Sequence, residues 1–525
     1  MSQKVVYHQV DFSGGLNDSA SPIEIAQDEA SVLQNWDITY KGQLKRRAGL
    51  TKKGDTIHAT NPIRGLAPFL RTTGAKDILA IQNNDLYYLN SSTWTALDTS
   101  SFSGSNYYWM ETCPNNNKLY ISNEDNTTRS WDRASTTLNS CLTDLGNTKF
   151  QANVMRWHKN HMFFLNNLKV GATSYPNYMG WSAIGDPDTH DTTNDKISIP
   201  GDGRVITAID LGDSLVIFKE RAIQFLRGWG DTDWQITGSS SNVANIDERV
   251  GICGPRACTR VGNEVWFMDD EGNIRRLYQT DFDAYRRDII SNNIQGTLSG
   301  LNKAQLSKVI AWTWNDKVYF AVPSGSATEN NLVLVYDIIS ARRTGKESWT
   351  TYTGWAPSLF CDYLTTSTPE LYVGGNATGK VWIHTGNDDD GTAISARWDG
   401  FDSDYGDEGV DKIYKYGRIS GNTTSSTASI AVYSSVDQTA FANLGNLELI
   451  STGEGLGPTG TFRLGPTGTS VLGGSGDIQN FQYFFSSGGG AILGKRVRMS
   501  LRTSNTGVQP VVNSFYNYFT KRKAN

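Results

Sequence analysis

The 525-residue sequence has few of the side chains that enzymes and metal proteins most often use for chemistry. It contains only 6 histidines. Its 5 cysteines are odd in number and form no CxxC pair, which argues against a disulfide framework and against a zinc site. We expect buried, reduced thiols. The cysteines are Cys113, Cys141, Cys253, Cys258 and Cys361.

Charged residues and long apolar runs are scarce as well. Charged residues make up 19% of the chain, and its formal net charge is −5. The basic runs at 45–47 and 521–523 are short, whereas a protein that grips DNA usually carries a basic stripe. No apolar stretch reaches the roughly 18 residues of a membrane span, and the first residues lack the apolar region of a secretory signal. We therefore expect synthesis in a cytoplasm, no membrane span and no tight hold on DNA.

Glycine and aromatic residues, by contrast, are abundant. The 52 glycines lie among serine, threonine and asparagine between short apolar runs, a pattern that predicts many turns and many short strands. The 15 tryptophans, 23 tyrosines and 20 phenylalanines make disorder implausible and can fill sizeable cores. The composition therefore predicts an all-β fold.

A turn followed by a short apolar and aromatic strand recurs seven times along the chain. The intervals between the first apolar residues of these strands are 33, 43, 53, 50, 53 and 53. Spacings of about 50 residues suit one four-stranded sheet per repeat, which is the blade of a propeller. The seven segments are 85–89, 118–122, 161–165, 214–218, 264–268, 317–321 and 370–374.

We predict three regions from this organisation. Residues 57–386 form a β-propeller of about seven blades, because radial stacking buries both faces of each sheet and a closed ring protects the edges. A sandwich of unrelated hairpins is the alternative for the same pattern. Residues 1–56 form an extended N-terminal arm with one short helix around 28–34, where Asp28 and Glu29 suit a helix N-terminus. Residues 387–525 form a C-terminal β-sandwich-like domain with a Gly-rich loop at 453–476.

Three local patterns invite a catalytic or binding interpretation, and we favour a structural one for each. Residues 374–381 resemble a phosphate-binding loop, but Val381 replaces the hydroxyl that holds magnesium and a strand follows instead of a helix. His158 and His161 flank a predicted hairpin tip, so we expect surface residues and not metal ligands. The repeated turn of sialidase propellers is absent, although paired glycosidase carboxylates meet only in three dimensions. We expect no enzymatic activity and no cofactor.

Acidic residues cluster just after the predicted propeller. Calcium prefers carboxylate oxygens, but this spacing matches no EF-hand, so we favour a solvated acidic surface over a calcium site. These side chains are also our candidates to face a channel or a neighbouring subunit. They are Asp388, Asp389, Asp390, Asp399, Asp402, Asp404, Asp407, Glu408 and Asp411.

The N-terminal stretch 11–50 resembles the opening of tail proteins from many tailed bacteriophages. In those proteins an aromatic-x-Gly-Gly-Leu/Ile-Asn segment is followed by Ser-Pro, an acidic helix ending in Leu-x-Asn, and Gly-x-Leu-x-x-Arg-x-Gly. Segments 205–228 and 251–277 are similar to other recurring parts of the same proteins. The matching residues here are Phe12, Gly14, Gly15, Leu16, Asn17, Ser21, Pro22, Leu33, Asn35, Gly42, Leu44, Arg47 and Gly49.

This resemblance implies a propeller-bearing tail nozzle or tail tubular protein of short-tailed phages. Such proteins form a ring below the portal and its adaptor, and DNA leaves through the ring. The implied partners are other copies of the chain, portal-adaptor proteins, tailspike or fibre proteins, needle or tip proteins, and double-stranded DNA in transit. The implied location is the virion tail.

From the same resemblance we expect a closed, sixfold ring whose channel passes DNA without gripping it, because phosphate contacts would slow sliding. The N-terminal arm and the 453–476 loop are our candidates for contacts between proteins. Two other functions stay open at this point. One is a receptor-binding or glycan-degrading propeller on a tail appendage, and the other is a non-viral carbohydrate-binding propeller.

Overall fold

A computed structural model describes residues 4–228, 234, 243–247, 249–281, 284–364, 368–423, 428–449, 479–485 and 491–522. Within these ranges nearly all regular structure is β-strand, and the longest helix, α2, spans only Ile338–Thr344. The all-β class is confirmed. The other helical segments are η2 (Asn292–Ile294), α1 (Gln295–Ser299) and η3 (Lys303–Lys308). No helix in the described ranges is long and apolar enough to cross a membrane.

Residues 50–384 form seven four-stranded antiparallel units, or blades. The first contains β7 (Ile63–Leu70), β8 (Lys76–Gln82), β9 (Asp85–Asn90) and β10 (Thr93–Asp98). The second contains β11 (Trp109–Cys113), β12 (Lys118–Asn123), β13 (Asn126–Trp131) and β14 (Thr143–Asp144). The third contains β16 (Val154–His158), β17 (His161–Leu165), β20 (Tyr178–Trp181) and β21 (Lys196–Ser198). A small sheet of β15 (Phe150–Gln151), β18 (Leu168–Val170) and β19 (Thr173–Tyr175) accompanies it.

The remaining blades follow the same plan. The fourth contains β22 (Val205–Leu211), β23 (Ser214–Lys219), β24 (Ile223–Leu226) and β25 (Val243–Asp247). The fifth contains β26 (Cys258–Val261), β27 (Glu264–Met268), β28 (Ile274–Asp281) and β29 (Ala284–Ile289). The sixth contains β30 (Ile310–Trp314), β31 (Lys317–Val322), β32 (Leu332–Asp337) and β33 (Trp349–Tyr352). The seventh contains β34 (Pro357–Leu364), β35 (Pro369–Gly375), β36 (Val381–His384) and β6 (Leu50–Lys52).

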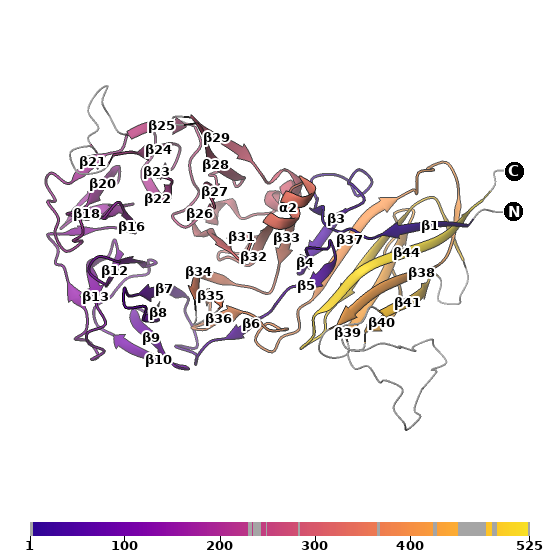
Figure 1. Ribbon diagram of the computed structural model, residues 1–525, viewed down its shortest axis with the longest axis horizontal. Coiled ribbons are helices and arrows are strands. Elements are labelled where there is room, and N and C mark those ends of the chain that lie inside the picture. Colours follow the sequence, from indigo (N-terminus) through magenta and orange to yellow (C-terminus); the bar gives the residue numbers. More distant parts are fainter. Residues whose placement is uncertain are drawn as a thin grey trace.

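The blades close into a ring (Figure 1). The first strand of each blade contacts the first strand of the next, in the order β7, β11, β16, β22, β26, β30 and β34, and β34 contacts β7 again. A strand in a blade that is covered on both faces is buried along its whole length, and all residues of β17 and β23 are indeed buried. The predicted propeller is therefore confirmed, and the alternative of a hairpin sandwich over this region is wrong.

The ring is closed by a strand from the N-terminal region. β6 pairs antiparallel with β36, with Thr51 opposite Ile383, so the seventh blade combines three late strands with one early strand. Residues 50–52 thus belong to the propeller, although we expected the predicted arm to extend to residue 56. Nothing in the short segment Leu50–Lys52 marks it as part of a repeat that is more than 300 residues away.

The predicted equivalence of the seven repeat strands holds in six blades. β12, β17, β23, β27, β31 and β35 are each the second strand of a blade. In the first blade the predicted segment is β9, the third strand, and β8 takes the second position. β8 has no aromatic residue, whereas β9 contains Tyr87 and Tyr88. The prediction therefore took β9 as the repeat strand of the first blade, and this made the first interval short.

Two sheets form a sandwich beside the propeller, but residues 387–525 do not make it alone. The prediction of an extended N-terminal arm is wrong, because five strands between residues 4 and 46 pair within these two sheets. The first contains β1 (Lys4–Gln9), β4 (Trp36–Ile38), β5 (Leu44–Arg46), β38 (Lys412–Thr423), β41 (Gln479–Phe484), β42 (Ile492–Gly494) and β44 (Pro510–Lys521). The second contains β2 (Gly15–Leu16), β3 (Glu29–Gln34), β37 (Ala396–Ser403), β39 (Ala428–Val436), β40 (Ala442–Leu449) and β43 (Val497–Thr503). Trp398 packs edge-on against both Phe12 and Phe515 in the core between them, with ring centroids 5.3 and 5.7 Å apart. The 453–476 loop lies outside the described residues.

The helix predicted around residues 28–34 is wrong, because Glu29–Gln34 forms the strand β3. β3 lies between two strand edges: it pairs antiparallel with β37, and its Gln34 pairs in parallel with Thr351 of β33. A helix would leave the backbone groups on both edges without partners, so tertiary pairing overrides the local acidic signal. As a result, the sixth blade and one sandwich sheet form a single ten-stranded sheet.

Candidate functional site at the joint

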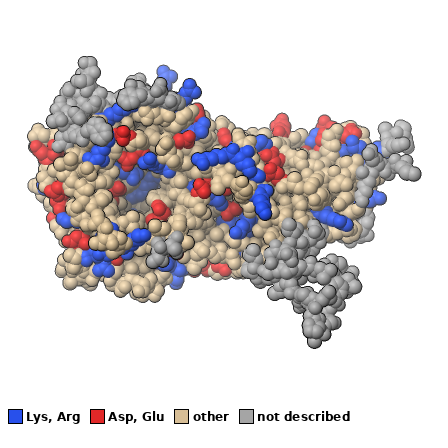
Figure 2. Space-filling model, in the orientation of Figure 1, with Lys and Arg blue, Asp and Glu red and all other residues tan. Residues whose placement is uncertain are grey.

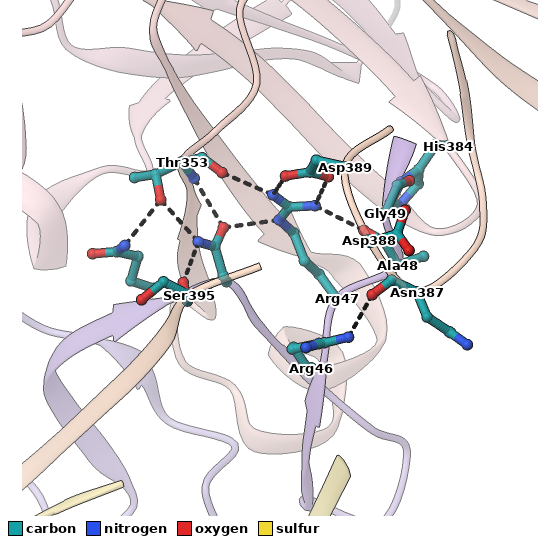
Figure 3. Close-up of polar contacts among 12 residues, drawn as sticks. Arg46, Arg47, Ala48, Gly49, Thr353, His384, Asn387, Asp388, Asp389 and Ser395 are labelled. Atoms are coloured by element: carbon teal, nitrogen blue, oxygen red, sulfur yellow. Dashed lines mark hydrogen bonds and ion pairs between the residues drawn. The ribbon is translucent and has the colours of Figure 1, made fainter. Parts of the chain in front are cut away.

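The residues that carry the family resemblance meet where the propeller contacts the sandwich. We call this region the joint and define it as residues 12–49, 348–355 and 384–399. Three segments that are far apart in the chain come together there, and Figure 3 shows their polar contacts around Arg47. The joint is our candidate functional site because the N-terminal resemblance falls mainly on it.

Arg47 is the centre of the joint, and its side chain is fully buried. Its two terminal nitrogens bind the two carboxylate oxygens of Asp389 at 2.9 and 2.6 Å. Its Nε donates to the side-chain oxygen of Asn35 at 2.8 Å, and its terminal nitrogens also donate to the carbonyls of Ala48 and Thr353. Every nitrogen of this guanidinium therefore has an acceptor, which is the condition under which a buried charge is tolerated.

Asn35 joins three segments through its side chain. Its amide nitrogen donates to the Thr353 hydroxyl at 2.8 Å and to the Ser395 carbonyl at 2.6 Å. Its oxygen accepts from Arg47 and from the backbone N–H of Thr353 at 2.9 Å. Its φ of 57° lies in the left-handed region, which asparagine tolerates better than most residues. This position therefore requires both the backbone freedom and the amide group of asparagine.

Two further signature residues are explained by close contact between chain segments. A Cβ on Gly49 would overlap the carbonyl oxygen of Asp388, so no larger residue fits there without moving that backbone. Gly15 has a φ of +75°, and a Cβ there would lie 2.7 Å from the backbone nitrogen of Trp349. Both glycines allow the N-terminal region to lie directly against the propeller and the segment that follows it.

The other signature residues also have packing or hydrogen-bonding roles. The core of the sandwich includes Phe12, and Leu16 is buried within the same cluster. The Asn17 amide donates to the Glu29 carboxylate at 2.9 Å, and the Pro22 carbonyl accepts from the N–H of Asp402. Gly14 and Gly42 lie in turns of this region, and Gly15 begins the short strand β2. None of the described contacts places a signature residue beside an open catalytic constellation.

A second buried network lies on the propeller side of the joint. Asp37 accepts from Lys317 at 2.5 Å and from the Tyr352 hydroxyl. Burial alone would raise the pKa of Asp37, but Lys317 and the hydrogen bonds hold it below its usual value. Burial lowers the pKa of the nearby His384 to about 3, so this imidazole is neutral at physiological pH. Its Nδ1 lies 3.2 Å from the Gly49 carbonyl and donates to it.

The nine acidic candidates do not form one acidic surface. Six of them are in ion pairs with Lys or Arg of the same chain, so much of their charge is balanced locally. These pairs are Asp389 with Arg47, Asp390 with Lys380, Asp399 with Arg397 and Arg498, Asp404 and Glu408 with Arg496, and Asp407 with Lys521.

The other three candidates have different surroundings. Asp388 accepts the N–H of Gly391 in a turn at 2.9 Å. Burial raises the pKa of Asp402, and one of its oxygens is buried without a hydrogen-bond partner among the described residues. The Asp411 carbonyl accepts from the N–H of Arg522. No group of three or more potential ligands in the described ranges is arranged to hold a metal ion.

The local patterns with possible chemistry are parts of the fold. Residues 374–381 include the turn between β35 and β36, and Lys380 pairs with Asp390 at 2.6 Å. His158 and His161 do flank a hairpin tip, but the prediction of surface histidines is wrong. Both are buried, His161 against the Ser182 carbonyl at 2.7 Å and His158 against Asp210. All five cysteines are free thiols, and Cys253 alone is only partly buried.

Comparison with known proteins gives structural likeness only. No family profile matches the chain, and no curated protein matches it. Among solved structures, the AfRom2 CNH domain is 10% identical, with a TM-score of 0.38, over 64% of this chain and 98% of that one. The C-terminal WD40 domain of Sif2 is 13% identical, with a TM-score of 0.36, over 61% of this chain and 81% of that one. The propeller assignment therefore rests on the seven blades and the closed ring described above.

Proposed function

We propose that this chain is a structural subunit of a bacteriophage tail, which forms a nozzle-like ring below the portal and adaptor through which DNA is ejected. The proposal rests on the positions and contacts of the signature residues. The residues that resemble tail proteins, including Asn35, Arg47 and Gly49, are those that fix the propeller to the sandwich. In this proposal the chain has no catalytic role.

The rigidity of the joint supports this role. A ring closes only if every subunit presents its two contact surfaces at a fixed angle. Here the sixth blade and a sandwich sheet share one ten-stranded sheet, and the buried Arg47–Asp389 pair reinforces the connection. A freely hinged pair of domains would instead allow open or irregular assemblies. The joint therefore fixes the angle between the propeller and the sandwich.

The charge distribution supports weak contact with DNA. Figure 2 shows acidic and basic side chains interspersed over the propeller, with Lys and Arg gathered near α2. Arg343 and Lys346 in that area lie 3.5 and 2.6 Å from Asp11 and Asp28, respectively, which reduces the local positive field. We therefore expect the free protein to bind duplex DNA more weakly than about 1 µM at physiological salt. A Kd for duplex DNA well below this value would contradict the passage of DNA without tight binding.

Electron microscopy of the virion, with an antibody against this chain, tests the proposal directly. A ring at the base of the tail would support it. Labelling of fibres or spikes would favour the receptor-binding or glycan-degrading alternative instead. A glycan-release assay on the purified protein separates the two forms of that alternative, because only the enzyme produces new reducing ends.

A further inference from the structure

The propeller contains two connected cavities along its axis. The larger, of about 410 Å³, is the mouth, on the side where the first strands of the blades begin. The smaller, of about 170 Å³, lies deeper between those strands. Arg256 and Ile310 line both cavities. Figure 2 shows the hollow at the centre of the ring, with basic atoms in its depth.

Two arginines line the inner cavity, and they differ from Arg47 in their partners. Arg156 donates through Nε to the Ala208 carbonyl at 2.7 Å, and Arg256 donates through one terminal nitrogen to the Tyr108 carbonyl at 2.9 Å. Neither guanidinium forms an ion pair, since no carboxylate of the described residues lies within 4.0 Å of it. Each therefore keeps donor nitrogens without a protein acceptor in the described structure.

The aromatic wall of the cavity holds both cations in place. The guanidinium carbons of Arg156 and Arg256 lie 4.8 and 5.0 Å from the ring centre of Trp109. Stacking on an indole fixes a guanidinium plane and leaves its edge free to bind an acceptor. Burial lowers the pKa of Arg256 to about 10, so its charge persists at neutral pH.

A tryptophan and one opposing charge complete the lining of the inner cavity. Trp312 lines it, and its indole N–H is buried without an acceptor among the described residues. Glu111 also lines it and accepts from the Trp109 indole at 3.3 Å. Burial raises the pKa of Glu111, while Arg156 acts in the opposite direction. With Glu111 ionised, two cations face one anion, and the cavity has one positive charge in excess.

We propose that the central cavity of the propeller binds a carboxylate, held between Arg156 and Arg256. A carboxylate is planar, accepts two parallel hydrogen bonds from a guanidinium and neutralises a single excess positive charge. A dianionic phosphate would exceed that charge. The carboxylate belongs either to a small organic acid or to an acidic side chain that a partner protein inserts through the mouth. This inference does not depend on the proposed function.

Isothermal titration of the full-length protein tests the proposal with three probes: propionate, an N-acetylated and C-amidated Gly-Glu-Gly peptide, and inorganic phosphate. We expect saturable binding of at least one carboxylate probe with a Kd below about 1 mM. Loss of one charged donor in Arg156→Gln or Arg256→Gln should weaken it by about tenfold or more. Tighter binding of the peptide identifies a partner's side chain as the source, and tighter binding of propionate identifies a small acid.

Two variants keep this experiment interpretable if an arginine variant misfolds. Glu111→Gln removes the opposing charge, so carboxylate binding should tighten several-fold. Arg221→Gln removes an equivalent charge from the surface, where the side chain is 69% exposed, and should leave binding unchanged. The proposal is overturned if wild type and Glu111→Gln show no saturable carboxylate binding below about 10 mM. It is also overturned if folded Arg156→Gln and Arg256→Gln bind like wild type, or if phosphate binds tightest.

Discussion

Arg47 in the joint is fully buried, Arg256 in the propeller cavity is partly buried, and the donors of the two side chains are used differently. The Arg47 guanidinium has a bidentate carboxylate, an amide oxygen and two carbonyls as acceptors. Arg256 has one carbonyl and two aromatic faces. A guanidinium whose donors all have protein acceptors stabilises the fold, whereas one with donors that lack acceptors can bind a ligand. This difference separates an architectural site from a candidate binding site within one chain.

The largest expected effect is on the stability of the joint. Arg47→Met removes one partner of a buried ion pair and leaves Asp389 unpaired, which should cost about 3–5 kcal/mol in the free energy of unfolding. Arg256→Met should change it by less than about 1 kcal/mol, because no carboxylate loses its partner. Chemical denaturation of both variants measures the difference. Equal losses would remove the distinction between the two arginines.

A double variant sharpens this prediction. Arg47→Met combined with Asp389→Leu removes both charges, and replacing a whole buried pair by apolar residues is often close to neutral. We expect the double variant to recover most of the stability that Arg47→Met loses. A double variant as unstable as the single one would show that Asn35, Thr353 and the other hydrogen-bond partners matter more than the ion pair.

The next effect concerns the close contact at Gly49. Gly49→Ala must displace the Asp388 carbonyl, and overpacking of this kind costs about 1–3 kcal/mol. Gly409→Ala is the matched control, because a Cβ there meets no atom within 4 Å. It should change stability by no more than about 0.5 kcal/mol. Thermal unfolding of the two variants measures this, and similar Tm values would refute the contact argument.

The sequence predicted the propeller well, because six second strands are continuous apolar and aromatic runs after a turn, as the burial of β17 and β23 requires. It could not predict the joint. Arg47 and Asp389 are 342 residues apart, and their charge alone names no partner. Asp28 and Glu29 indicated a helix, but the open edges of β33 and β37 determine a strand there. The buried positions of His158 and His161 likewise depend on packing that no local pattern shows.

A smaller effect follows from the neutral His384 beside the joint. Burial lowers its pKa to about 3, whereas an unfolded histidine binds a proton near pH 6.5, so the unfolded state binds more protons at acidic pH. Stability should therefore fall as the pH drops from 6 to 4, by up to about 1.4 kcal/mol per pH unit from this group. His384→Gln should remove that part of the slope. The part from His190, whose pKa burial lowers to about 4, should remain. Denaturation curves at several pH values measure the slopes, and identical slopes would contradict the argument.

The smallest expected effect is at Lys380. Its pair with Asp390 is about one-third exposed on both sides, and such pairs contribute no more than about 1 kcal/mol. Lys380→Ala should leave assembly and infectivity unchanged. A nucleotide-binding assay is the check, because binding by the wild type that disappears in this variant would restore the phosphate-loop interpretation of residues 374–381.

The central claim, that a rigid joint makes this chain a ring subunit, is tested most directly by cryo-electron microscopy of the assembled tail. We predict a closed ring of this chain, sixfold, in which every copy shows the same angle between propeller and sandwich and the channel passes along the ring axis. A single copy in the virion, an appendage position, a channel lined by Lys and Arg, or copies with different angles at the joint would contradict the account.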